Sequence, residues 1–352
     1  MRESIRTIIS NSRYQYIDAL RGLAMFLVVF VHVEIFGFFE FSHFTFLGKL
    51  FSTIHMPIFF FISGFCIYRP DHVYGKSRLY NDILRLLIPP FIVGLLYTYF
   101  KLDKDIFFFL SNPMKAGYWF TMSLFEILII YYIVSNFIKD NSRLFDLSLI
   151  FLALFLYLLK LPLKIVPQAE LIANYLCLHQ TFNFFIFFVV GIMVSKYRVQ
   201  ILKYISDKWV LTILLLLFSV LSYLLFFGIT PLVSNVIIMQ VIYTLCETVI
   251  GLLGVILLFV LFSTHKSNFS DASKVGKILI LVGNNTLAIY LIHYFLIPFL
   301  PEIGEFLLEY PSVLCELSIC LPVSFMIIIA SICTAKLIRI SPILGKVLLG
   351  DK

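Results

Sequence analysis

Long apolar runs follow one another along the whole chain, and each is long enough to cross a lipid bilayer as a helix. The connecting segments are short, and none has the Gly/Ser-rich composition of a flexible linker. The pattern predicts an all-α, polytopic bundle of about ten transmembrane helices, forming one domain over 1–352 with no fused soluble domain. The predicted spans are 17–36, 50–68, 83–100, 118–138, 144–163, 176–195, 209–228, 236–262, 278–299 and 313–335.

Composition excludes the main alternatives. Hydrophobic residues make up 61% of the chain and charged residues 13%, whereas a soluble domain has about 45–50% apolar and about 25% charged residues. A soluble enzyme, a disordered chain and a coiled coil are therefore excluded. The six cysteines form no CxxC pair and mostly lie in apolar runs, so we interpret them as small core residues.

The basic residues predict how the chain is oriented. With ten spans and the N-terminus inside, 21 of the 27 Lys and Arg residues fall on the cytoplasmic side. This asymmetry follows the positive-inside rule and predicts that both termini are cytoplasmic. It also accounts for the net charge of +7 without nucleic acid, because the chain has no basic stretch with interleaved aromatic residues.

A few polar residues lie inside the predicted spans, where charged groups are costly and usually functional. His32 and His293 each lie 15 residues beyond the inner start of their spans, so they share one depth. His55 and Glu126 lie in the same outer half of the membrane. An intramembrane histidine also fits a structural, hydrogen-bonding role, and the sequence does not show that these groups face one another.

The first span adds a directional argument. Arg21 and His32 are 11 residues apart, which places both on one helix face, separated by about 16 Å along the axis. Arg85 opens the third span at the predicted cytoplasmic face, and with Arg21 it suits an anion such as phosphate. Arg21 also fits a simple cytoplasmic anchor that extends to the lipid surface.

Five short motifs together resemble the integral-membrane acyltransferase family three, whose bacterial members modify surface carbohydrates. They occur in family order between residues 18 and 293, and each is weak alone. The matching segments are DALRG at 18–22 followed by His32, HMPIFFFISGF at 55–65, RLLIP at 85–89, YWF at 118–120, and GNNT at 283–286 running into IYLIH at 289–293.

The resemblance implies an O-acyltransferase that moves an acyl group, acetyl or a larger unit such as succinyl, from cytoplasmic acyl-CoA to a carbohydrate or glycolipid hydroxyl. It implies His32 as general base. His293 is a second candidate base or a binder, and Glu126, an acid inside a span, is a catalytic candidate that would orient or charge-stabilise a histidine, with Asp18 as the alternative. Acyl-CoA would bind at Arg21, Arg85 and Arg78. Arg78 stands in for a basic residue that many relatives carry at the position of Asp82. The expected location is the inner, cytoplasmic membrane.

Other candidates concern the acceptor. Tyr118 and Trp119 at the outer end of the fourth span suit stacking on a sugar ring, although an interfacial aromatic belt explains them equally well. The remaining candidates for substrate binding are His55, Ser63 and Tyr290, and Ser63 also fits close helix packing. We expect acyl-CoA as a donor substrate, no permanently bound cofactor, no metal and no nucleic-acid partner.

One different class of function fits the same features. Ten spans with intramembrane Glu and His residues are also typical of a proton-coupled transporter or a lipid-linked sugar flippase. Against it, the chain has no paired, Gly/Pro-broken segments in two matching halves. The acyl group, the acceptor glycan and the oligomeric state are left open.

Overall fold

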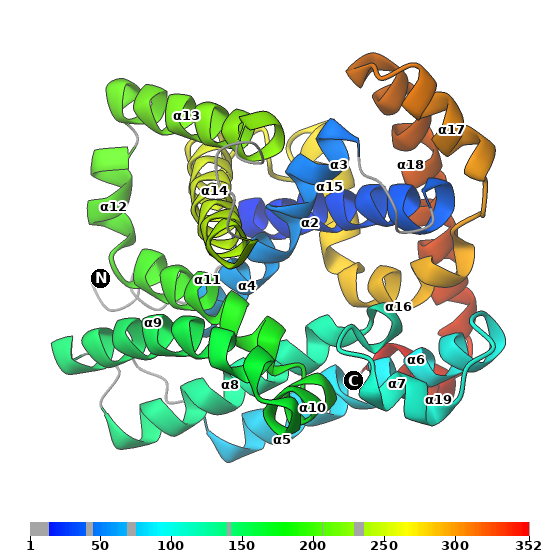
Figure 1. The fold of residues 1–352 in the computed structure, drawn as a ribbon, viewed down its shortest axis with the longest axis horizontal. Coiled ribbons are helices and arrows are strands. Elements are labelled where there is room, and N and C mark those ends of the chain that lie inside the picture. The colour runs from blue at the N-terminus through cyan, green and yellow to red at the C-terminus, as the bar shows by residue number, and fades with distance from the viewer. Residues whose placement is uncertain are drawn as a thin grey trace.

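The computed structural model describes residues 14–39, 45–68, 75–138, 142–205, 207–228 and 236–351, and every element that these residues form is a helix (Figure 1). The longer elements are α2 (Gln15–His32), α4 (His55–Ile67), α5 (Lys76–Leu86), α6 (Ile88–Phe100), α8 (Trp119–Phe137), α9 (Arg143–Ile165), α11 (Leu178–Lys196), α13 (Lys208–Tyr223), α14 (Val236–Thr264), α15 (Lys274–Asn284), α16 (Thr286–Leu296) and α18 (Val313–Ile338). Shorter ones are η1 (Val33–Phe38), α3 (Phe46–Ser52), α7 (Ile106–Ser111), η2 (Lys115–Gly117), α10 (Pro167–Tyr175), α12 (Arg198–Ile205), η3 (Leu224–Gly228), α17 (Pro301–Glu309) and α19 (Pro342–Leu349).

The helices confirm the predicted polytopic bundle. Among the described residues, eight are long and apolar enough to span a membrane, or nine if one bent pair counts as a single span. The fifth predicted span, 144–163, falls on α9, a 23-residue helix that is not among these candidates. The orientation of the bundle stays a prediction.

Several spans are interrupted where the sequence predicts continuous helices. The ninth predicted span consists of α15 and α16, which are bent by 80° at Asn285. The third is divided at Leu87, two residues before the Pro89-Pro90 pair, because a proline ring disfavours helical geometry in the preceding turn. Residues beside both breaks, Leu86 and Thr286, line the main cavity, so helix ends with their partial charges lie next to it.

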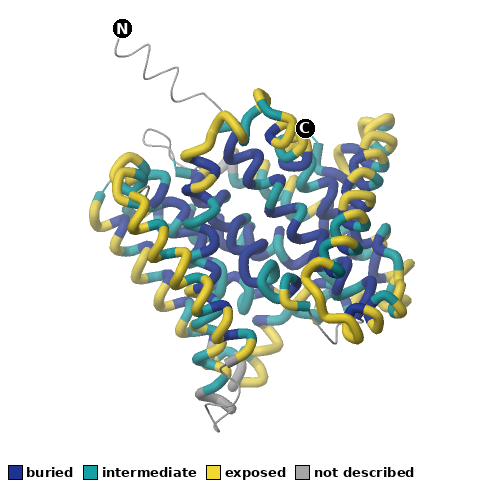
Figure 2. The backbone as a smooth tube through the Cα atoms, turned by 90° about the horizontal axis from the view of Figure 1, so that it is seen from above, coloured by how far each residue is buried: buried dark blue, intermediate teal, exposed yellow. Residues whose placement is uncertain are grey.

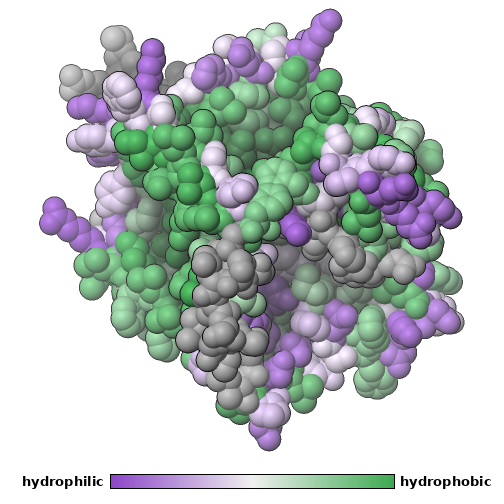
Figure 3. Space-filling model, turned by 45° about the horizontal axis from the view of Figure 1, so that its top comes forward, coloured by the Kyte–Doolittle hydropathy of each residue, from purple (hydrophilic) through white to green (hydrophobic). Residues whose placement is uncertain are grey.

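Helix α2 lies in the middle of the bundle, where α15 and α4 pack against it (Figure 1). Most of its side chains are buried, and Figure 2 shows the buried interior enclosed by helices with exposed outer faces. Along α13 and η3, only 11% of the most apolar stretch is buried within the protein. Broad apolar areas on the outer surface (Figure 3) suit contact with lipid, where an apolar exterior has no cost.

Glycines allow the closest helix contacts. A Cβ added to Gly64 of α4 would lie 1.9 Å from the carbonyl oxygen of Phe188, and one added to Gly191 of α11 would lie 2.1 Å from that of Phe61. Gly22 and Gly283 make the same kind of contact between α2 and α15. Small residues at such crossings bring backbones together, so the position of α2 depends on them.

The α4–α11 crossing gives a direct test of this packing. We expect Gly64→Ala to lower stability by about 1–3 kcal/mol, because the two backbones must separate to admit a methyl group. The midpoint of thermal unfolding in detergent measures it. Gly75→Ala is the control, since an added Cβ there meets nothing within 4 Å. An unchanged midpoint for Gly64→Ala would contradict the close packing.

Candidate active site

A cavity of about 600 Å³ runs along α2 and reaches the residues that carry the sequence motifs. Arg21, near the start of α2, lines it together with Arg85 of α5. His32, the last residue of α2, lines it together with His55 and Gly117. The cavity therefore joins two arginines to a histidine over about 16 Å of helix, and its volume is typical of a small-molecule site.

His32 and His293 are in direct contact. The Nδ1 of His32 lies 2.8 Å from the Nε2 of His293, and the Nδ1 of His293 lies 2.9 Å from the carbonyl oxygen of Ile289. His293 is fully buried, whereas His32 is partly exposed and lines the cavity. His55 approaches His32 edge-on, with ring centroids 6.4 Å apart.

This chain of contacts assigns the protons on both rings. A carbonyl oxygen only accepts, so Nδ1 of His293 carries a proton and its Nε2 is an acceptor. Nδ1 of His32 must then donate to that Nε2, which leaves the Nε2 of His32 unprotonated. A basic lone pair on His32 is thus held in place by a neighbour that cannot itself reach the cavity.

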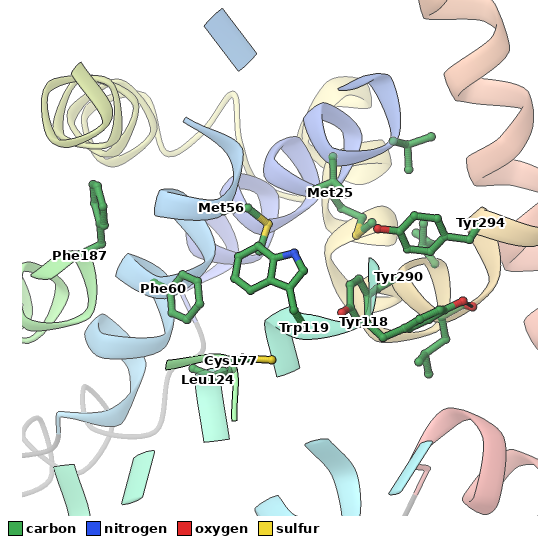
Figure 4. Close-up of a cluster of buried hydrophobic side chains, with 14 of the residues drawn as sticks. Met25, Met56, Phe60, Tyr118, Trp119, Leu124, Cys177, Phe187, Tyr290 and Tyr294 are labelled. Carbon is green, nitrogen blue, oxygen red and sulfur yellow. Dashed lines mark hydrogen bonds between the residues drawn. The ribbon is translucent and has the colours of Figure 1, made fainter. Parts of the chain in front are cut away.

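Two tyrosines of α16 complete the site. The hydroxyls of Tyr290 and Tyr294 both donate to the carbonyl oxygen of Gly117, at 3.2 Å each. The Tyr294 hydroxyl also lies 3.4 Å from the Nε2 of His32. Figure 4 shows both rings beside Tyr118 in the buried cluster. Tyr294 was not a sequence candidate, although its spacing of four residues from Tyr290 puts both on one helix face.

The segment that presents Gly117 is strained and braced. Lys115, Ala116 and Gly117 all have positive φ, of 47°, 50° and 101°. The ammonium of Lys115 donates to the carbonyls of Leu110, Asn112 and Asn174, and burial lowers the pKa of Lys115. Strain of this kind persists where surrounding contacts determine the conformation, and it concentrates at functional sites.

Gly117 also has no room for a side chain. A Cβ at this position would lie 2.4 Å from the hydroxyl oxygen of Tyr294. The absence of a side chain here is therefore what lets Tyr294 lie between the Gly117 carbonyl and His32.

At the other end of the cavity, Arg21 lies 3.4 Å from Asp18 and its side chain is 29% exposed. Thr286 and Leu287, the first residues of α16, line the same cavity, and a helix N-terminus favours anions. Asp82 lines it as well. The side chain of Arg78, on α5, lies outside the described residues.

The remaining acceptor candidates divide into two groups. His55, Ser63, Trp119 and Tyr290 line the cavity. Trp119 stacks on Phe184, with centroids 5.4 Å apart. Tyr118 does not line the cavity, because its buried hydroxyl donates to the Leu291 carbonyl at 2.9 Å.

Besides Tyr294, the structure adds Gln180 as a polar residue of the cavity wall that the sequence does not predict. Gln180 donates from Nε2 to the Pro113 carbonyl at 3.0 Å, and its buried Oε1 has no hydrogen-bond partner. Gln180 lines the cavity. A lone glutamine near the start of a span gives no signal in the sequence.

Glu126 is not brought to the histidines. Its Oε2 accepts from the Thr181 hydroxyl at 2.5 Å, and Glu126 is not part of the cavity wall. A role for Glu126 in orienting a histidine stays a prediction. The carboxylate of Asp18 pairs with Arg21 at 3.4 Å.

The cavity of this membrane-type helical bundle has a histidine at one end and arginines at the other, an arrangement that suits an enzyme site. The family model of acyltransferase family three, described as an acyltransferase domain, matches residues 14–334. The chain therefore belongs to this family and is a multi-pass membrane acyltransferase. No curated protein and no solved structure gives a significant match.

Proposed function

We propose that the protein is an O-acyltransferase that moves an acyl group, most simply acetyl, from cytoplasmic acyl-CoA to a hydroxyl of a surface or exported carbohydrate. The observation that carries this proposal is the single cavity lined by Arg21 and Arg85 at one end and by His32 at the other. Anion-binding groups and a base joined by one cavity suit a long donor with phosphates at one end and a thioester at the other.

The donor's phosphates would lie at the arginine end. Arg21 and Arg85 supply planar, permanently charged groups that bind phosphate oxygens in pairs, and the N-terminus of α16 adds a favourable dipole. The pantetheine arm would follow α2 toward His32. The separation of Arg21 and His32, about 16 Å along the helix axis, is of the order of that arm's reach.

The acyl transfer would occur at His32. The acceptor hydroxyl gives its proton to the Nε2 of His32 as its oxygen bonds to the thioester carbonyl carbon. The C–S bond then breaks, and the leaving thiolate takes the proton back from His32. His293 would act as a positioning residue, since it fixes the tautomer of His32 and does not line the cavity.

The acceptor would lie between Trp119 and the Gly117 segment. An indole face suits the apolar face of a sugar ring, and the partnerless Oε1 of Gln180 suits a sugar hydroxyl.

Mass spectrometry of surface glycans tests the proposed function. Glycans from cells with the protein should carry an acyl group that is absent from glycans of cells without it. Glycans from cells with the His32→Ala protein should also lack that acyl group. The added mass identifies the acyl group, and fragmentation identifies the acceptor. Glycans of unchanged mass in all three strains would contradict the proposal.

Donor binding gives a separate prediction. We expect Arg21→Ala to weaken binding of CoA by about tenfold to a hundredfold, because a charge-assisted hydrogen bond contributes about 1.5–3 kcal/mol. Arg21→Lys should recover part of the affinity, since it keeps the charge but loses the planar fork. Isothermal titration of the purified protein with CoA measures both. Arg143→Ala, at an exposed arginine outside the cavity, should bind CoA normally. Normal affinity of the Arg21→Ala protein for CoA would contradict a role of Arg21 in donor binding and would leave it as a cytoplasmic anchor of the helix.

A further inference from the structure

We propose that the hydroxyl of Tyr294 is a catalytic group that stabilises the oxyanion formed on the thioester carbonyl. This inference rests on the proposed acyl transfer and adds a residue to it. Attack on a thioester moves an electron pair onto the carbonyl oxygen, and a hydrogen-bond donor directed at that oxygen is among the largest contributions to such catalysis.

The position of Tyr294 fits this role. Its hydroxyl lies 3.4 Å from the Nε2 of His32, and the two ring centroids are 4.9 Å apart. An acceptor oxygen bonded to that Nε2 would therefore lie within reach of Tyr294, and so would the carbonyl oxygen it attacks. Tyr294 lines the cavity and is otherwise buried, so little water competes for its proton.

The neighbouring polar side chains are already committed to main-chain carbonyls. Nδ1 of His55 lies 2.8 Å from the Phe51 carbonyl, and the Ser63 hydroxyl donates to the Phe59 carbonyl at 2.8 Å. Each of these carbonyls would lose a partner if the side chain turned to the substrate.

The carbonyl partner of Tyr294 is shared with a second tyrosine. The Gly117 carbonyl accepts from Tyr290 as well as from Tyr294, at 3.2 Å in both cases. When the Tyr294 hydroxyl hydrogen rotates toward the substrate, Tyr290 still satisfies the Gly117 carbonyl. The free-energy cost of leaving a buried acceptor unpaired is therefore avoided. Because the Gly117 carbonyl has two donors, the Tyr294 hydroxyl can donate to the substrate instead.

In the proposed step, His32 carries the proton and Tyr294 stabilises the negative charge on the carbonyl oxygen. The acceptor oxygen forms a bond to the carbonyl carbon and gives its proton to the Nε2 of His32. The carbonyl electron pair moves to oxygen, which accepts a hydrogen bond from Tyr294 without taking its proton. When the carbonyl re-forms, the C–S bond breaks and the CoA thiolate receives the proton from His32.

The test compares two donors in Tyr294→Phe, which keeps the ring and removes the hydroxyl. With acetyl-CoA and glycan from cells lacking the protein, we expect kcat to fall about 100-fold, with little change in the KM for acetyl-CoA. With chloroacetyl-CoA the fall should be several times smaller, because the chlorine makes the oxyanion less basic and less dependent on the hydrogen bond.

Tyr97→Phe is the matched control. The ring of Tyr97 packs 5.5 Å from that of Tyr294, but Tyr97 does not line the cavity. The activity of the Tyr97→Phe protein should therefore stay within twofold of that of the unsubstituted protein. An equal loss with both donors in Tyr294→Phe would indicate a structural role and overturn the inference, as would a normal kcat. If the unsubstituted protein transfers no acyl group at all, the proposed function itself fails.

Discussion

His32→Ala is expected to lower acyl transfer by about 10³-fold or more while leaving CoA binding unchanged. General-base catalysis contributes about 10²–10⁴-fold, and the hydrogen-bond chain through His293 leaves the Nε2 of His32 unprotonated at the cavity. Release of CoA from acetyl-CoA, in the presence of glycan from cells lacking the protein, measures the rate.

His265→Ala is the control for this substitution. His265 is exposed and does not line the cavity, so its removal should not change the rate. Normal transfer by a correctly inserted His32→Ala protein would remove His32 from the mechanism.

His293→Ala is expected to lower the rate by about 10²-fold or more, although His293 does not line the cavity. Without the Nε2 acceptor of His293, the Nδ1 proton of His32 has no partner at 2.8 Å. The other tautomer, which has its proton on Nε2 and its free lone pair on Nδ1, away from the Nε2 position that would meet the acceptor hydroxyl, then becomes populated. The same CoA-release assay measures the loss, with CoA affinity as the check on folding.

His293→Gln separates positioning from direct proton transfer. A glutamine side-chain oxygen can take the place of the histidine Nε2 as an acceptor but cannot act as a base. We expect His293→Gln to recover a large part of the activity that His293→Ala loses. Equal loss in both variants would indicate that His293 itself moves a proton.

The membrane-spanning helices could be predicted from the sequence, because each depends mainly on the apolar residues of its own segment. Apolar runs such as 209–228 predict spans because hydrocarbon excludes exposed polar backbone, and α13 with η3 lies at that position. The 80° bend at Asn285 was not predicted, because Gly283-Asn284-Asn285 was considered as a motif and not as a helix break. Short helices such as α10 and α17 were missed, since they depend on contacts between segments.

The sequence predicted the membrane depth of the site residues, but it did not predict which side chains contact one another. Equal depth predicts one membrane level for His32 and His293 but not their contact, and the structure brings their ring nitrogens to 2.8 Å. The same argument included Glu126, which instead contacts Thr181. Depth does not give the direction in which a helix face points once helices have packed. Tyr294 was overlooked because adjacent residues on a helix point about 100° apart, and only the Gly117 segment brings its hydroxyl into the site.

The most direct test of the central claim uses inside-out membrane vesicles with radiolabelled acetyl-CoA outside and glycan acceptor enclosed. Acetyl-CoA then meets only the cytoplasmic face. We expect label in the enclosed glycan with the unsubstituted protein and about 10³-fold less with His32→Ala. Equal labelling by both proteins, or movement of intact glycan without any acyl transfer, would contradict the central claim.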